Sequence, residues 1–159
     1  MRCSRSTAAL DVLEWDVRMR VRYSIDKQRR LILTTAEGAL TFDDIKGHQD
    51  LLLADPDFDA SFDQLIDATN ALRFGISADE ARILAERRIV TPESRRAFVA
   101  TEPHIFGLAR MMEIYREGRE YAEVHVFYSM DEALKWLEKG KEENHENLTR
   151  PANPGRTAP

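Results

Sequence analysis

Ser77 is the residue of this chain whose surroundings come nearest to a modification site. It lies in Gly75-Ile76-Ser77-Ala78, directly before a segment with helical periodicity, so its hydroxyl is expected at a helix N-terminus. A phosphate there would be stabilised by free backbone N–H groups and would add a charge of about −2. The apolar residues Phe74 and Ile76 would then border a partner surface. The alternative is a capping box formed by Ser77 and Glu80, which explains the serine without any modification.

A second candidate is a ligand crevice formed by His104, Phe106 and Arg110. These residues begin a predicted helix directly after a predicted strand. In open parallel sheets, ligands bind at the edge where the carboxyl ends of the strands meet, which is where this group is expected. The alternative is an ordinary surface turn followed by a charged helix face.

Motifs for other chemistry are missing from the sequence. It contains no phosphate-binding glycine loop, no nucleophile elbow and no His/Glu zinc motif. The alternating acids from Asp55 to Asp63 resemble a calcium loop, but Ala60 replaces the required glycine and Ile66 the terminal acid. We therefore predict no catalytic residue, no metal site and no cofactor, and we favour a non-enzymatic protein.

Composition limits the class of protein further. The 159 residues are 43% hydrophobic and 32% charged, which is typical of one globular domain. The net charge of −5 argues against nucleic acid as a partner, and the only cysteine, Cys3, cannot form an internal disulfide. No apolar run approaches the ~20 residues of a membrane span, and the N-terminus is a poor signal peptide. We expect a cytoplasmic location.

The elements that would position these residues follow from hydrophobic periodicity. Val17 to Ile25 alternates with basic residues and predicts a half-buried strand, which a short polar turn joins to a second strand. We expect Gly38 to end the second strand and Gly140 to end the last helix. The predicted strands are 17–25, 30–37, 62–69, 96–100 and 122–128; the predicted helices are 41–54, 77–88, 103–117 and 129–139; residues 70–77 are predicted to be a loop.

This order predicts an α/β fold with one mostly parallel, five-stranded sheet, an N-terminal antiparallel hairpin and four helices. We divide the chain into a flexible N-terminal arm (1–16), the domain (17–139) and a disordered tail (140–159). Met19 begins the first well-patterned segment and is a candidate for the true start.

The chain also resembles the bacterial SpoIIAA-like, STAS-related family, whose members are largely uncharacterised. No single motif carries the resemblance, which depends on an ordered set of segments over roughly 19–138. They are Tyr23-Ser24-Ile25-Asp26, Arg30-Leu31-Ile32, Gly38 with Leu40-Thr41, Leu53-Ala54-Asp55-Pro56-Asp57-Phe58, Phe62-Asp63-Gln64-Leu65-Ile66-Asp67, Ser94-Arg95-Arg96-Ala97-Phe98-Val99-Ala100, Phe106-Gly107-Leu108-Ala109-Arg110-Met111, and Val126-Phe127 with Ala133-Leu134-Trp136-Leu137.

The resemblance implies a SpoIIAA/STAS-like fold and two functions. The first is a regulatory or protein-interaction domain, whose relatives are phosphorylated within an Asp-Ser-Ser/Thr-Gly motif; here only the serine, Ser77, is kept. The second, implied by the comparison of the family with CRAL-TRIO lipid carriers, is binding of a small apolar ligand. The partner is thus a protein or such a ligand, and the sequence leaves the oligomeric state open.

Overall fold

The structure is a computed structural model that describes residues 19–118 and 121–149. The predicted arm (1–16), the first two residues of the first predicted strand and residues 150–159 lie outside this range. Within the described residues, no helix is both long and apolar enough to cross a membrane.

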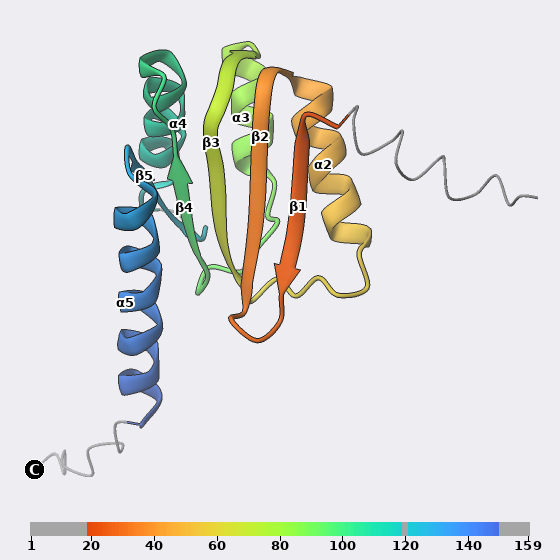
Figure 1. The fold of residues 1–159 in the computed structure, drawn as a ribbon. Helices are drawn as coiled ribbons and strands as arrows, with labels where there is room; N and C mark the ends of the chain where they lie inside the picture. Colours follow the sequence, from red (N-terminus) through yellow and green to blue (C-terminus); the bar gives the residue numbers. More distant parts are fainter. Residues whose placement is uncertain (1–18, 119–120, 150–159) are drawn as a thin grey trace, which may run out of the picture.

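One sheet organises the molecule, and its strands lie in the same order as in the sequence (Figure 1). The first two strands form an antiparallel hairpin, and every later neighbouring pair is parallel. The strands are β1 (Val21–Asp26), β2 (Leu31–Thr41), β3 (Asp63–Gly75), β4 (Arg95–Val99) and β5 (Glu123–Phe127). The predicted fold class, a five-stranded mostly parallel sheet with an antiparallel hairpin at its start, is confirmed.

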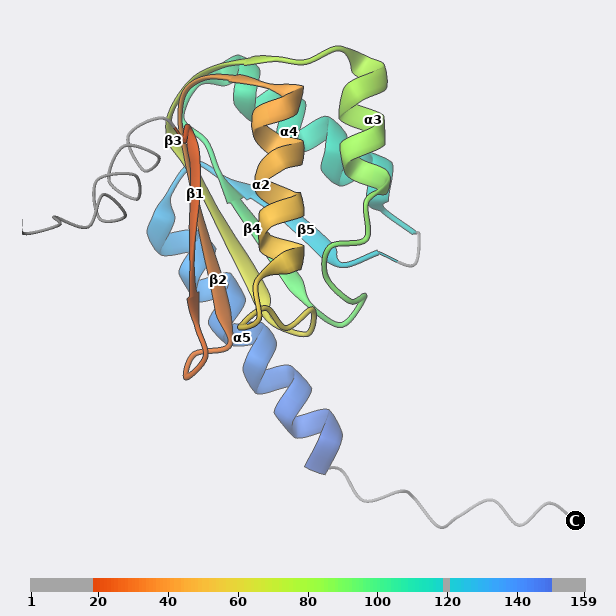
Figure 2. The ribbon, with the colours of Figure 1, turned by 90° about the vertical axis from the view of Figure 1, so that its right-hand side faces the viewer.

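Four helices within the described residues cover the two faces of this sheet unequally. They are α2 (Phe42–Ala54), α3 (Ala78–Glu86), α4 (Pro103–Arg116) and α5 (Met130–Thr149). Helices α2, α3 and α4 lie on one face and α5 on the other (Figures 1 and 2). Capping boxes begin α2 at Thr41 and α3 at Ser77, and the second of these was predicted from the spacing of Ser77 and Glu80.

Alternation along the strands decides which residues meet which helices. Leu65 on β3 and Ala97 and Val99 on β4 point toward α5, where they pack with Ala133 and Leu137. The residues that alternate with these three along β3 and β4 point toward α2, α3 and α4. Strands β3 and β4 are therefore covered on both faces, which is the usual condition of parallel strands.

Strands β2 and β3 are longer than the sequence predicts, and this corrects two expectations. Gly38 does not end β2: its φ of +71° is accommodated at an irregularity in the pairing of β2 with β3. Pairing then resumes and carries β2 to Thr41 and β3 to Gly75. Most of the predicted loop 70–77 is therefore strand, and Leu40 lies opposite Phe74.

Helix α5 likewise continues through Gly140 to Thr149, so the predicted end at Gly140, and with it the disordered tail over 140–149, is wrong. The reason is tertiary, because the Arg95 side chain occupies the space that a Cβ at Gly140 would need. Arg95 donates hydrogen bonds to the Trp136 carbonyl at 3.3 Å and to Glu143 at 2.8 Å. Glycine thus provides room for an arginine that joins the helix to β4.

Candidate functional site

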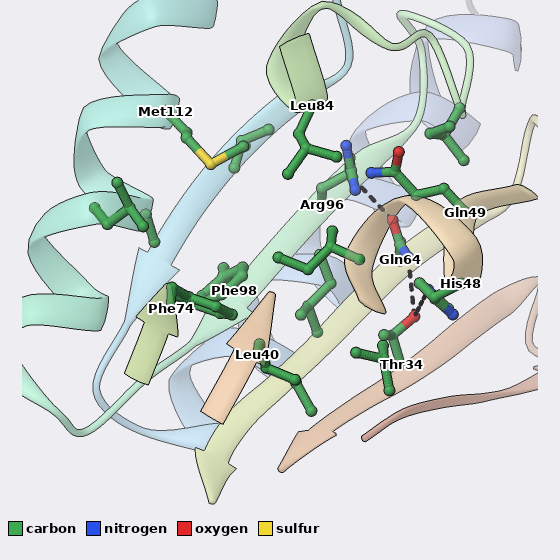
Figure 3. A pocket seen from close by; sticks show the side chains of 18 of the residues that line it. Thr34, Leu40, His48, Gln49, Gln64, Phe74, Leu84, Arg96, Phe98 and Met112 are labelled. Atoms are coloured by element: carbon green, nitrogen blue, oxygen red, sulfur yellow. Dashed lines mark hydrogen bonds between the residues drawn. The ribbon is translucent and has the colours of Figure 1, made fainter. Parts of the chain in front are cut away.

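A cavity of about 110 Å³ lies between the sheet and helices α2, α3 and α4. It exists because α3 contacts mainly α2 and α4 and not the sheet. Figure 2 shows α3 set away from the strands, on the far side of α2 and α4. The Leu84 side chain of α3 reaches back toward the sheet and forms part of the cavity wall (Figure 3).

Most of the wall is apolar. Phe98 on β4 and Ile66 on β3 belong to inner strands that the three helices cover, yet both stay only half-buried. Both line the cavity, so their free surface faces it. The remaining apolar lining residues are Val21, Ala36, Leu40, Ile45, Phe74, Ile76, Leu84, Ile89, Leu108, Ala109, Met112 and Val124.

One end of the cavity is polar, and its side chains form a chain of hydrogen bonds (Figure 3). Arg96 Nε on β4 donates to Gln64 Oε1 on β3 at 2.9 Å. Gln64 Nε2 donates to Thr34 Oγ1 on β2 at 2.9 Å, and Thr34 Oγ1 lies 3.4 Å from His48 Nε2 on α2. Adjacent strands thus supply one polar residue each, in positions where buried strands normally carry apolar ones.

The guanidinium of Arg96 has no counter-charge within the described residues. No carboxylate pairs with it, and its two terminal nitrogens have no hydrogen-bond partner there. Burial, together with the nearby charge of Arg116, lowers the pKa of Arg96 to about 9. The Arg96 side chain is half-buried and lines the cavity, so an unpaired positive charge faces this end of the cavity and attracts negative charge there.

Arg116 adds a second guanidinium from α4. Its Nε donates to the Ala85 carbonyl at 2.9 Å and one terminal nitrogen to the Arg87 carbonyl at 3.2 Å, which holds α4 to the end of α3. The other terminal nitrogen, Nη1, is buried and has no acceptor within the described residues. Arg116 also lines the cavity.

His48 is held neutral at the same end. Burial, and next the charge of Arg96, lower its pKa to about 4, so the ring is uncharged near neutral pH. Its Nδ1 and the Oε1 of its neighbour Gln49 are buried without hydrogen-bond partners. No aspartate or glutamate lines the cavity, so its charged lining residues are both arginines.

The structure separates the three residues of the predicted Ser77 surface. The Ser77 hydroxyl is exposed and accepts from Glu80 N, while the Glu80 carboxylate accepts from Ser77 N, which completes the capping box. Phe74 and Ile76 are half-buried and line the cavity. Phe74 packs against Phe98 with ring centroids 6.3 Å apart.

The predicted crevice residues His104, Phe106 and Arg110 do not line the cavity. His104 is exposed. Phe106 stacks on Tyr128 with ring centroids 3.8 Å apart, and Arg110 Nη1 lies 2.5 Å from Glu113 Oε1. The neighbouring residues of α4 that do reach the cavity are Leu108, Ala109 and Met112.

The acidic stretch from Asp55 to Asp63 is used to shape its own loop. Asp55 accepts from Tyr23 Oη at 2.9 Å and from Asp57 N at 2.9 Å, and Asp59 accepts from Ser61 N at 2.9 Å. Among the residues the structure describes, no group of three or more His, Cys, Asp or Glu could hold a metal ion.

The polar residues of the cavity were not singled out from the sequence. The signal was available in Gln64 and Arg96, because each is a polar residue on the inner-facing side of a predicted buried strand. Such positions are normally apolar, and a polar residue there marks either a satisfied network or a binding site.

No family model and no curated protein matches the chain. It is similar in structure to an uncharacterised DUF3478-family protein from Shewanella loihica PV-4, which has a SpoIIAA-like fold. The match has a TM-score of 0.52 and 18% sequence identity, and it covers 74% of this chain and 93% of that chain. The chain therefore has a SpoIIAA-like fold.

Proposed function

We propose that this protein binds a small, mostly apolar ligand in the cavity between the sheet and helices α2, α3 and α4. The observation that carries the proposal is the half-buried state of Ile66 and Phe98 beneath three covering helices. Interiors of folded proteins are normally packed without voids of this size, so a lined, unfilled cavity needs an explanation. A cavity of this order can hold an aromatic ring or a short alkyl chain.

The apolar end of the cavity lies at the carboxyl ends of β2 and β3. Leu40 and Phe74 close to these strand ends, Ile45 at the start of α2 and Ile76 before α3 line it there. Ligands of open α/β sheets bind at this edge, which supports access where β2 passes into α2 and β3 into α3.

Native mass spectrometry of the protein purified gently from its own host tests the proposal. We expect an adduct on the folded protein that is lost on denaturation. Met112→Trp places a larger side chain in the cavity and should remove the adduct. Met111→Trp is the matched control: Met111 is its neighbour on α4, is 47% exposed and does not line the cavity, so the adduct should remain.

An unliganded wild-type chain would contradict the proposal, and so would an adduct that both variants retain. Circular dichroism of the two variants shows whether each is folded. Restoration of the adduct by refolding the wild-type chain with its own extracted small molecules would separate a specific ligand from a contaminant.

A protein-interaction role is the second candidate, and one observation favours it. Leu72 on β3 is 68% exposed, and the strand leads directly to the exposed hydroxyl of Ser77. An apolar side chain this open suits a contact with a partner. The same native spectra test this role, because a protein partner that is retained by wild type and lost from Leu72→Asp would support it.

A further inference from the structure

We propose that the ligand is an amphiphile with a carboxylate head, and that the carboxylate binds the Arg96 guanidinium inside the cavity while the apolar tail extends toward Leu40 and Phe74. This inference rests on the proposed function and specifies the ligand of the same site. It is carried by one juxtaposition, an unneutralised arginine fork at the polar end of a cavity whose remaining wall is apolar.

Protein contacts fix the orientation of the Arg96 fork. Arg96 uses Nε on Gln64, and Gln64 is itself fixed by its bond to Thr34. The plane of the guanidinium is therefore set by protein contacts, while its two terminal nitrogens remain available. A planar fork with two free donors matches the geometry of a carboxylate, which can accept both hydrogen bonds at once.

The charged side chains of the cavity wall are all positive. The described residues provide two arginines and no carboxylate in the cavity wall, and His48 is neutral near pH 7. One monoanionic head would compensate the positive charge of Arg96, which is poorly solvated inside the cavity. A cationic head would meet two like charges, and a neutral head would leave both uncompensated.

Further polar groups lie around the Arg96 fork. Arg116 Nη1 is a buried donor without an acceptor. Gln49 directs its amide toward the same end of the cavity (Figure 3). Buried polar groups are normally hydrogen-bonded, so an unpaired arginine donor beside the cavity adds positive potential that an anionic occupant would compensate. A carboxylate has enough lone pairs for Arg96 and for a second donor.

The rest of the cavity wall suits an apolar tail. Away from the polar residues, the wall consists of aliphatic and aromatic side chains from β2, β3, α2 and α4, including Leu40, Phe74 and Leu108. These side chains offer no hydrogen bonds, so they select for hydrocarbon. An inorganic anion would satisfy Arg96 but would leave this part of the cavity empty.

Isothermal titration calorimetry with octanoate, 1-octanol, octylammonium and acetate tests the inference on the full chain. The first three probes share a tail and differ in head group, and acetate keeps the head without the tail. We expect octanoate to bind at least about tenfold more tightly than octanol, because a charge-assisted bidentate pair replaces a neutral hydrogen bond. Octylammonium and acetate should bind more weakly than octanol and octanoate, respectively.

Arg96→Met removes the fork while keeping a long apolar side chain. It should weaken octanoate at least about tenfold and leave octanol within about threefold of wild type. Arg82→Met is the matched control, because Arg82 is an exposed arginine on α3 that does not line the cavity. Arg82→Met should leave all four affinities unchanged. A thermal unfolding curve of each ligand-free variant shows that it is folded.

The possible results separate the two proposals. Equal binding of octanoate and octanol, unaffected by Arg96→Met, would overturn the carboxylate inference and leave the apolar pocket standing. Preference for octylammonium would also overturn it. Acetate binding as tightly as octanoate would show an anion site without a tail subsite. Binding of none of the four probes would overturn both proposals.

Discussion

Neighbouring residues on β3 and β4 point to opposite faces of the sheet and meet opposite environments. Leu65 and Ala97 face α5, where they are 3% and 0% exposed within a continuous apolar cluster. Gln64 and Arg96, one position earlier on each strand, face the cavity and form a polar relay. The same two strands therefore contribute to a packed core on one side and to a polar-ended cavity on the other.

The covering helices account for this difference. The 20-residue α5 packs Ala133 and Leu137 directly on the strands. The nine-residue α3 stands on α2 and α4 and leaves space above the sheet. We infer that the α5 face serves stability alone. The opposite face also holds buried clusters beneath α2 and α4, and its cavity is available for binding, since binding sites commonly keep polar groups that a stable core would exclude.

Among the substitutions that test this difference between the two faces, Leu65→Ala should have the largest effect on the free energy of unfolding. It removes buried methyl groups from the α5 face and should lower the free energy of unfolding by about 3 kcal/mol. Octanoate affinity of the folded protein should be unchanged, because Leu65 does not line the cavity. Urea titration and calorimetry measure the two quantities, and a large loss of affinity in a folded Leu65→Ala protein would show that the two faces are not independent.

The second largest effect concerns pH on the cavity face. Because the folded pKa of His48 is about 4 and lies below its usual value of 6.5, the unfolded chain binds the proton first as pH falls. Stability should therefore be fully present above pH 6.5 and decline toward pH 4, with a loss of about 2 kcal/mol between pH 7 and 5.

Urea unfolding of wild type and His48→Asn at several pH values checks this expectation. The asparagine variant lacks the titrating ring, so its stability should depend less on pH over the same interval. Parallel pH profiles for the two proteins would contradict the assignment of the effect to His48.

The smallest predicted effect distinguishes two helical glycines. A Cβ at Gly140 on α5 would collide with the Arg95 side chain, whereas a Cβ at Gly107 on α4 would meet no other group within 4 Å. Gly107→Ala should stabilise the protein by up to about 1 kcal/mol through helix propensity. Gly140→Ala should lose that gain and destabilise by about 1 kcal/mol, because Arg95 must leave its contacts with Trp136 and Glu143.

Thermal unfolding of the two alanine variants provides the measurement. Equal stabilisation by both substitutions would show that Arg95 adapts freely, and the account of why α5 continues past Gly140 would then be wrong.

Local pattern was sufficient to predict much of this fold. The capping box at Ser77 depends on residues within one helical turn, and the alternation in β1 depends on neighbours two positions apart. What the sequence did not reveal depends on distant partners. Gly38 is tolerated within β2 because β3 pairs beyond it, and Gly140 is tolerated within α5 because Arg95 crosses it.

The cavity was not predicted from the sequence for the same reason. The predicted crevice of His104, Phe106 and Arg110 does not line it. The cavity forms because α3 packs on α2 and α4 instead of on the sheet, which no local pattern encodes, and Phe74 and Ile76 are among its wall residues. Arg96, the residue that distinguishes the cavity, lies on the inner strand β4, where buried positions are normally apolar. Its polarity at such a position was the only signal in the sequence.

A crystal structure of the protein with octanoate tests the central claim most directly, because it locates both ends of the ligand. The account predicts the carboxylate about 2.7–2.9 Å from the terminal nitrogens of Arg96, with the chain extending past Phe98 toward Leu40 and Phe74. Octanoate bound in the reverse direction, with its carboxylate near the starts of α2 and α3, or bound outside the cavity, would contradict it.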